Sequence, residues 1–193
     1  VAITLKAKDS HKKGIIANKV KHNDLARQVS GECIVLLKND NEILPLKSTL
    51  KKIAIVGNFA KTPRYQGAGS SQVRPTQIVN ALDELQKMAK GTQFSFSTGY
   101  NTEGETDDTK IAEAVQNAKN AELVIVFAGL PDSYESEGYD RKNLDMPAGH
   151  NQLISAVAEV NKNIVIVLMN GAPVSMPWKK DVSAIVEAYL GGQ

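Results

Sequence analysis

Cysteine is nearly absent from this chain of 193 residues, in which Cys33 is the single example. One cysteine excludes an internal disulfide framework. The sequence also lacks an apolar run near 20 residues and the apolar core of a signal peptide, so it predicts no membrane-spanning segment. Because the chain opens on Val1 and not on Met, its start is uninformative about targeting, and both a cytoplasmic and a secreted location stay open.

An excess of charge of one sign is missing too. The 23 basic and 21 acidic residues give a net charge of +2, which is too balanced to predict nucleic acid or a membrane surface as a partner. Hydrophobic residues at 42% and charged residues at 23% are typical of one globular domain, with or without an arm. No motif for a cofactor or a metal ion is identified.

Short apolar segments without alternation are present instead. Residues 51–57, 123–129 and 164–169 read KKIAIVG, LVIVFAG and IVIVLM, as expected of strands that are covered on both faces. Segments with helical spacing lie between or beside them (76–88, 107–118 and 148–160), and further strands are predicted at 94–97, nearer the sheet edge, and at 184–190. The pattern predicts an α/β fold, a three-layer sandwich with a mostly parallel central sheet and helices on both faces.

The helical segments carry more detailed expectations. Thr76 is a plausible cap for the helix at 76–88. The helix at 107–118 is expected to turn four residues inward: Ile111, Ala112, Val115 and Ala118. His150, in the first turn of the helix at 148–160, is interpreted as a surface residue in preference to a ligand.

The two ends of the chain are weaker in pattern. Residues 1–22 are predicted to be an arm or linker, because their lysines and histidines show no regular spacing. A helix is predicted to begin at Asn23 or Asp24, with Leu25, Val29, Cys33 and Leu36 or Leu37 near a 3.6-residue spacing. Residues 23–193 are the predicted domain, and a last strand that runs directly into Gly191-Gly192-Gln193 predicts that the domain continues beyond this sequence.

A long acidic loop, Leu130 to Pro147, follows the apolar segment at 123–129. It exceeds the roughly 12 to 15 residues above which structureless connections are usually functional or disordered. Its notable residues are Asp132, Tyr134, Glu135, Glu137, Tyr139, Asp140 and Arg141. Carboxylates beyond the end of a buried parallel strand lie where open α/β sheets bind ligands, although a solvated loop has the same composition.

A glycine-rich stretch, GAGSS at Gly67 to Ser71, lies some residues beyond the end of the strand predicted at 51–57. Small residues there could let backbone N–H groups approach a phosphate. However, no GxGxxG follows the strand directly and no Lys-Ser/Thr ends the stretch. A plain turn, a rim contact for a polar ligand and a nucleotide site all remain open.

Several stretches together resemble the second domain of family 3 glycoside hydrolases, the α/β sandwich that follows a TIM barrel in β-glucosidases and related exo-acting enzymes. The matching segments are GECIVLLKNDNEILPL, KKIAIVGNFA, GAGSSQVRP, LVIVFAGL, ESEGYDRKNLDMPAGHNQLI, NIVIVLMNGAPVSMPW and AIVEAYLGGQ. They cover most of Ser30 to Gln193. The resemblance implies a retaining β-glycosidase whose TIM-barrel domain, absent here, carries the nucleophile Asp, so this chain alone is expected to be inactive.

The resemblance also implies that a loop of the sandwich domain delivers the acid/base Glu. The glutamate before Gly-Tyr-Asp-Arg is Glu137, which is the predicted acid/base, with Glu135 as the alternative. Glu135, Tyr139 and Arg141 are the predicted substrate-binding residues. Arg141 could instead pair with Asp140 and fix the loop.

Two further questions stay open at this stage. Tyr134 and Tyr139 could form an aromatic wall against a sugar or simply anchor the loop. A different class of function, a non-catalytic ligand- or nucleotide-binding α/β domain using GAGSS, is the alternative to a β-glycoside-hydrolysing enzyme.

Overall fold

The computed structural model describes residues 17–138 and 140–192, and in this part of the chain the strands form one six-stranded sheet. The sheet order is β1-β6-β5-β4-β2-β3, and every neighbouring pair is parallel except β1 and β6. The strands are β1 (Val35–Asn39), β2 (Lys52–Val56), β3 (Gln93–Ser97), β4 (Leu123–Gly129), β5 (Ile164–Met169) and β6 (Ala184–Glu187). The mostly parallel sheet predicted from the apolar segments is therefore confirmed, with β3 at the edge.

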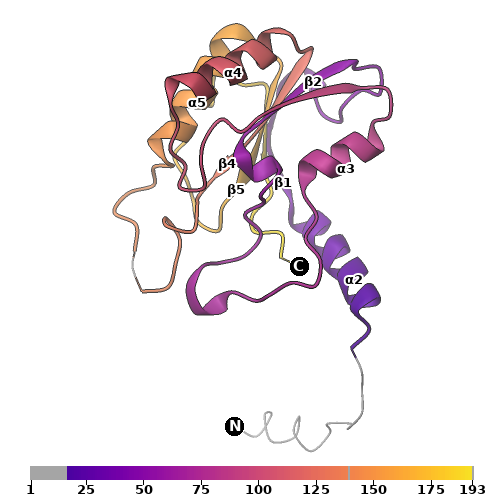
Figure 1. The fold of residues 1–193 in the computed structure, drawn as a ribbon, viewed down its shortest axis with the longest axis vertical. Coiled ribbons are helices and arrows are strands. Elements are labelled where there is room, and N and C mark those ends of the chain that lie inside the picture. The colour runs from indigo at the N-terminus through magenta and orange to yellow at the C-terminus, as the bar shows by residue number, and fades with distance from the viewer. Residues whose placement is uncertain (1–16, 139, 193) are drawn as a thin grey trace, which may run out of the picture.

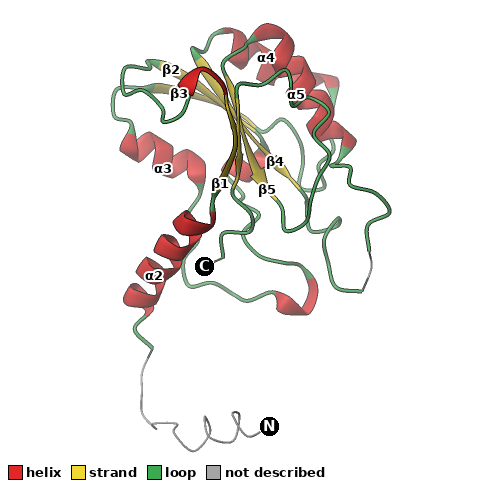
Figure 2. Cartoon of the chain, turned by 180° about the vertical axis from the view of Figure 1, so that it is seen from behind, coloured by secondary structure: helices red, strands yellow, loops and turns green. Residues whose placement is uncertain are grey.

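Helices lie on both faces of this sheet. The described helices are α2 (Lys19–Cys33), which buries no residue, α3 (Ala81–Met88), α4 (Asp108–Lys119) and α5 (Ala148–Val160), with short 3-10 turns at Asp40–Glu42, Asn58–Ala60 and Gly69–Ser71. Helices α4 and α5 lie side by side over one face, and α3 lies on the other (Figure 1). Seen from behind, α2 extends away from the sheet below α3 (Figure 2). None of these described helices is both long and apolar enough to cross a membrane.

Strand β4 is the centre of the core. All seven of its residues are buried, which explains why its sequence does not alternate. Its neighbours β2 and β5 are nearly as apolar and as deeply buried. These three strands place their carboxyl ends at one edge of the sheet, where the loops that follow them meet.

The N-terminal elements differ from the sequence prediction. The helix begins at Lys19 and not at Asn23, because the side chain of Asn18 accepts a hydrogen bond from the backbone N–H of Lys21. It ends at Cys33, and the extended backbone of Ile34 leads into β1. Leu36 and Leu37 therefore lie on a strand, so their near-helical spacing was misleading.

Two other helices are shifted relative to their predictions. Thr76 does not cap α3; Asn80 does, by accepting a hydrogen bond from the N–H of Asp83 at 2.9 Å. In α4, Ala112 is exposed and Ala114 is buried together with Ala118, so the inward face is rotated from the predicted one. Helix α4 packs on α5 as well as on β2 and β3. The face of α4 that is buried therefore lies between the sheet and α5.

The last strand is shorter than predicted. It ends at Glu187 and not at Leu190, because Tyr189 adopts a positive φ of 54°, which a strand does not accommodate. The Glu187 carboxylate accepts a hydrogen bond from the N–H of Tyr189 at 3.0 Å and so fixes this turn.

His150 is fully buried, so its interpretation as a surface residue was wrong. Its ring lies 3.9 Å from that of Tyr100 and edge-on to Phe59. Its Nδ1 accepts a hydrogen bond from the N–H of Gly129, at the end of β4, at 3.3 Å. His150 precedes Leu153, Ile154 and Val157 by three, four and seven residues, so it lies on the same buried face of α5. The surface interpretation followed its polar residue type and overlooked this spacing.

Glycine is required where β4 ends. Gly129 has a φ of +151°, and a Cβ there would lie 2.1 Å from the carbonyl oxygen of Met169 on β5. No larger residue fits without moving the backbone of one of the two strands, so Gly129 fixes the point where the acidic loop leaves the sheet.

We expect Gly129→Ala to lower the free energy of unfolding by about 3 kcal/mol, because it adds both a clash and a strained backbone. Gly31→Ala is the matched control, since nothing lies within 4 Å of a Cβ at that position in α2. That substitution should be neutral or stabilising by about 0.5–1 kcal/mol. Urea unfolding measures both, and equal effects would contradict the close approach at Gly129.

We expect acid to destabilise the fold through His150. Burial lowers its pKa from the ordinary 6.5 to about 4, so between these pH values the unfolded chain binds a proton that the folded chain does not. The stability is complete above pH 6.5 and falls as the pH drops towards 4, by about 2 kcal/mol between pH 7.5 and pH 5.

The control is His150→Gln, whose side chain keeps a hydrogen-bond acceptor but does not titrate. Urea unfolding at pH 7.5 and pH 5 should show a smaller difference in this variant than in the unchanged chain. The same loss in both proteins would assign the acid sensitivity to other groups.

Candidate functional site

The acidic loop, residues 130–147, leaves the carboxyl end of β4, and its described residues (130–138 and 140–147) form no helix or strand. An isolated parallel bridge pairs Ser136 with Ala68 of the GAGSS segment. Gln72 adds a second link, because its amide donates to the Asp132 carboxylate at 3.1 Å. The two loops that the sequence pointed to separately therefore form one site at the edge where open α/β sheets bind ligands.

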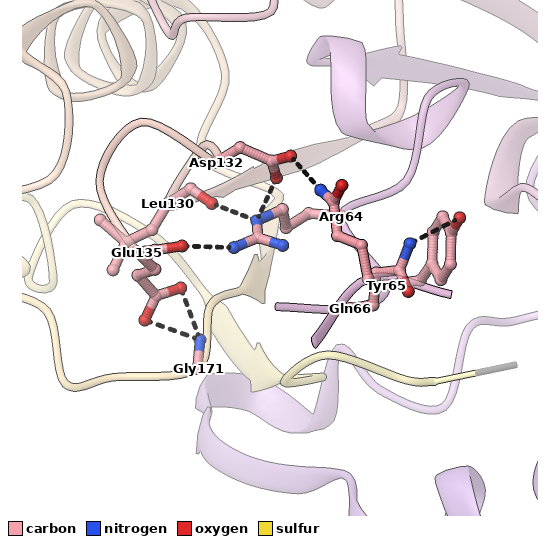
Figure 3. A network of polar contacts seen from close by, with 8 residues as sticks. Arg64, Tyr65, Gln66, Leu130, Asp132, Glu135 and Gly171 are labelled. Atoms are coloured by element: carbon pink, nitrogen blue, oxygen red, sulfur yellow. Dashed lines mark hydrogen bonds and ion pairs between the residues drawn. The ribbon is translucent and has the colours of Figure 1, made fainter. Parts of the chain in front are cut away.

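Arg64 holds the first half of the acidic loop in place (Figure 3). Its side chain is only 4% exposed. Its Nε donates to the carbonyl oxygen of Leu130 at 3.1 Å and pairs with Asp132 at 3.1 Å. One terminal nitrogen of the same guanidinium donates to the carbonyl oxygen of Glu135 at 3.2 Å. A buried charge with these partners fixes the loop backbone from residue 130 to residue 135.

Glu135 is bound to the protein itself. Both of its carboxylate oxygens accept from the N–H of Gly171, at 2.9 and 3.1 Å, so the side chain is directed to the end of β5 (Figure 3). Tyr134, next to it, packs against the hydrophobic core. Of the two roles considered for Tyr134, this packing fits the anchor.

Asn170 and Glu187 form a buried polar pair next to Gly171, the residue that binds Glu135. Asn170, which follows β5, donates to the Glu187 carboxylate at the end of β6 at 3.2 Å. Burial raises the pKa of Glu187, and the nearby charge of Glu135 adds to the effect. The pair joins the ends of two neighbouring strands directly beneath Gly171. Sequence reasoning did not identify Glu187, whose apolar strand gives no sign of a buried carboxyl group.

Glu137 differs from Glu135 in that it is exposed. Its Oε2 accepts a hydrogen bond from the N–H of Ser70 at 3.0 Å and another from the Ser70 hydroxyl. These two bonds hold the pKa of Glu137 below its ordinary value, and the bond from the hydroxyl has the larger effect. The GAGSS segment thus binds an anion, as a glycine-rich loop can, but the anion is a carboxylate of the same chain.

The remaining predicted residues give a mixed result. Arg141 donates to the carbonyl oxygen of Pro173 at 2.6 Å, which ties the outer part of the loop to the segment after β5. Across the described ranges no ion pair joins Arg141 to exposed Asp140, so that expectation was wrong. Tyr139 lies outside the described residues.

A cavity of about 310 Å³ with a mixed polar and apolar lining opens beside Arg64, among the loops that follow β2, β3 and β4. Its lining includes Asn58, Thr62, Tyr65, Gln66, Gln72 and Asp132. In residues 17–138 and 140–192, no three His, Cys, Asp or Glu side chains gather as metal ligands would. The chemistry that the described site offers is that of carboxylates and hydrogen-bond donors.

Arg64 and Ser70 are the residues that sequence reasoning missed. Arg64 stands in a loop with no charged residue directly beside it in the sequence, and Ser70 was considered only as part of a turn, a rim contact for a polar ligand or a nucleotide site. Their partners are at least 66 positions away along the chain. No local pattern encodes such contacts, so only the fold identifies them.

The chain matches known proteins over most of its length. The model of the glycosyl hydrolase family 3 C-terminal domain matches residues 34–193. Thermostable beta-glucosidase B of Acetivibrio thermocellus is 47% identical over 190 residues, which are 97% of this chain and 25% of that protein. An exo-alpha-(1->6)-L-arabinopyranosidase of Bifidobacterium longum is 44% identical over 182 residues, or 89% of this chain and 24% of that protein.

Solved structures agree with these matches. The crystal structure of the Bifidobacterium adolescentis GH3 beta-glucosidase has a TM-score of 0.86 and 46% sequence identity, over 94% of this chain and 27% of that one. The chain therefore spans about a quarter of the length of the curated relatives named here. With the family model matched over residues 34–193 and identities above 40%, the chain belongs to glycosyl hydrolase family 3, of which it contains the C-terminal domain.

Proposed function

We propose that this chain supplies the acid/base residue of a retaining, exo-acting β-glycosidase, and that this residue is Glu137. A TIM-barrel domain of the same parent enzyme supplies the nucleophile Asp and most of the sugar site. The observation that carries the proposal is the position of Glu137: an exposed carboxylate beyond the end of β4, on a loop braced by Arg64. A proton donor must be accessible and held in place, and Glu137 is both.

Glu135 is less suited to that role. Its two carboxylate oxygens are engaged by the N–H of Gly171, and its backbone carbonyl accepts from Arg64. To reach a sugar it would have to give up the contact that joins the loop to β5. We assign it a supporting role in which it fixes the base of the loop on which Glu137 stands.

The reaction needs Glu137 in two protonation states. As a general acid it gives its proton to the oxygen of the leaving group while the nucleophile attacks the sugar. As a general base it then takes a proton from the water that releases the sugar. Arg141, tied to Pro173, and Tyr139 complete the proposed sugar-binding rim on the same loop.

The barrel contributes more than the nucleophile in this proposal. In this chain the two Ser70 bonds favour the ionised form of Glu137, which cannot act as an acid. A second carboxylate about 5 to 5.5 Å away and a sugar that excludes water both raise the pKa of a carboxyl group. The domain by itself therefore lacks the nucleophile and the environment that protonates the acid, and it is inactive alone.

The substrate class is a β-glycoside of the kind that β-glucosidases hydrolyse. The names of the relatives include both a beta-glucosidase and an arabinopyranosidase, at 47% and 44% identity. Similar domains thus accompany different sugars, so in this proposal the barrel selects the sugar. The described contacts argue against nucleotide binding at GAGSS, because the N–H of Ser70 is already bound to Glu137 and is not available to a phosphate.

We expect Glu137→Ala in the full-length parent enzyme to lower kcat on an aryl β-glucoside by about 10²–10⁴-fold, because proton transfer is lost. Added azide should partly restore turnover and give a glycosyl azide, since a small anion can occupy the vacated space and attack the glycosyl-enzyme intermediate.

The matched control is Glu135→Ala, which removes a carboxylate two residues away on the same loop. It should lower activity less and show no rescue by azide. Rescue of Glu135→Ala and not of Glu137→Ala would move the acid/base role to Glu135, and unchanged turnover in both variants would refute the proposal.

We expect Arg64→Met to loosen the loop that carries Glu137. The substitution removes hydrogen bonds from a charged donor to two carbonyl oxygens, each worth about 1.5–3 kcal/mol. Because about 1.4 kcal/mol corresponds to a factor of ten in an equilibrium constant, the open form of the loop should become about tenfold more populated or more. Trypsin, acting on this chain under native conditions, should cleave after exposed Lys142 correspondingly faster.

Arg27→Met is the control, because Arg27 is exposed on α2, away from the acidic loop. It should leave the rate of cleavage after Lys142 unchanged. Equal rates in the two variants would show that Arg64 does not hold the loop.

A further inference from the structure

The GAGSS segment lies directly against the part of the acidic loop that carries Glu137. Ala68 forms a parallel bridge with Ser136. A Cβ added at Gly69, whose φ is +81°, would lie 3.3 Å from the Cβ of Glu137. This close approach needs a small residue at position 69, and it brings the next residue, Ser70, to the carboxylate.

Ser70 uses both of its donors on one oxygen atom. Its N–H and its hydroxyl both bind Oε2 of Glu137, and neither bond uses Oε1. The carboxylate is therefore held from one side. Among the described residues the bonds to this carboxylate go to Oε2, so in this proposal Oε1 meets the leaving group or the water.

From this geometry we infer that Ser70 is the positioning residue of the acid/base Glu137, whose carboxylate it orients through Oε2. The inference rests on the proposed role of Glu137. It assigns the glycine-rich segment a task within the same reaction.

A hydroxyl group suits a partner that changes its protonation state. It donates to an ionised carboxylate, and because it also carries acceptor lone pairs it can accept from a protonated carboxyl group. Ser70 can thus stay bonded to Glu137 in the acid step and in the base step. The N–H of Ser70 can only donate, so it favours the ionised form.

The other charged residues of the acidic loop close to Glu137 in sequence bind other partners or face solvent. Asp132 pairs with Arg64, and Glu135 binds the N–H of Gly171. Arg141 donates to the carbonyl oxygen of Pro173, whereas Asp140 is exposed to solvent. The GAGSS segment itself carries no charge. Ser70 is consequently the main cause of the lowered pKa of Glu137, and desolvation opposes it.

The first test measures the pKa of Glu137 directly, by ¹³C NMR titration of its side-chain carboxyl group in this chain. Ser70→Ala should raise the pKa, because the hydroxyl bond to the ionised form is lost. Ser70→Thr retains the hydroxyl and should restore the value. Ser48→Ala, which removes an exposed hydroxyl from another loop, is the control. An unchanged pKa in Ser70→Ala would overturn the inference.

The second test uses the pH profile of kcat/KM in the full-length parent enzyme. The loss of activity on the basic side reports deprotonation of the general acid, so Ser70→Ala should move this limb to higher pH, and Ser70→Thr should leave it in place. A merely structural role would lower activity at every pH without moving the limb.

The outcomes separate this inference from the proposed function. A shift in both the titration and the pH profile supports the inference. A shift in the titration alone overturns the positioning role of Ser70 in the reaction, and azide rescue of Glu137→Ala then decides independently whether Glu137 is the acid/base. No shift in either experiment overturns the role of Ser70 and leaves that of Glu137 to the azide result.

Discussion

The site depends on one buried cation. Arg64 has almost no contact with solvent, and a buried guanidinium is tolerated only where acceptors surround it. The acidic loop supplies these acceptors, two from its backbone and one from Asp132. The need of Arg64 for hydrogen-bond acceptors therefore determines the path of the loop after β4. The position of Glu137, two residues beyond the last of these acceptors, depends on that path.

The parallel sheet makes this arrangement possible. Parallel strands direct their carboxyl ends to the same edge, so the segments after β2, β4 and β5 meet there although they are far apart in the sequence. The segment after β2 supplies Arg64 and Ser70, and the segment after β5 supplies Gly171. Each of them binds the acidic loop at a different point. The long loop is thus held by the rest of the fold and not by its own structure.

The contrast between Glu135 and Glu137 shows how neighbouring carboxylates acquire different environments. Two positions apart in the sequence, they face different partners: Glu135 binds a backbone N–H at the end of β5, and Glu137 binds a serine after β2. Residue types alone could not separate them. The family resemblance ranked Glu137 first, and our proposal keeps that order because the two carboxylates have different partners.

Sequence alone determined the buried strands β2, β4 and β5, the edge strand β3, helix α5 and the acidic loop, because continuous apolar runs and periodicity are local and strong. It failed where a residue's environment comes from distant segments: the inward face of α4 is set by its contact with α5. The spacing of His150 from Leu153, Ile154 and Val157 indicates a buried position, but only the fold shows that Tyr100 and Phe59 enclose its ring. Arg64 gave no local signal, and the glycine-rich GAGSS stretch drew attention to Ser70 without indicating Glu137 as its partner. Only the tertiary structure decided their roles, since hydrogen bonds between segments more than 60 residues apart depend on where the sheet brings those segments.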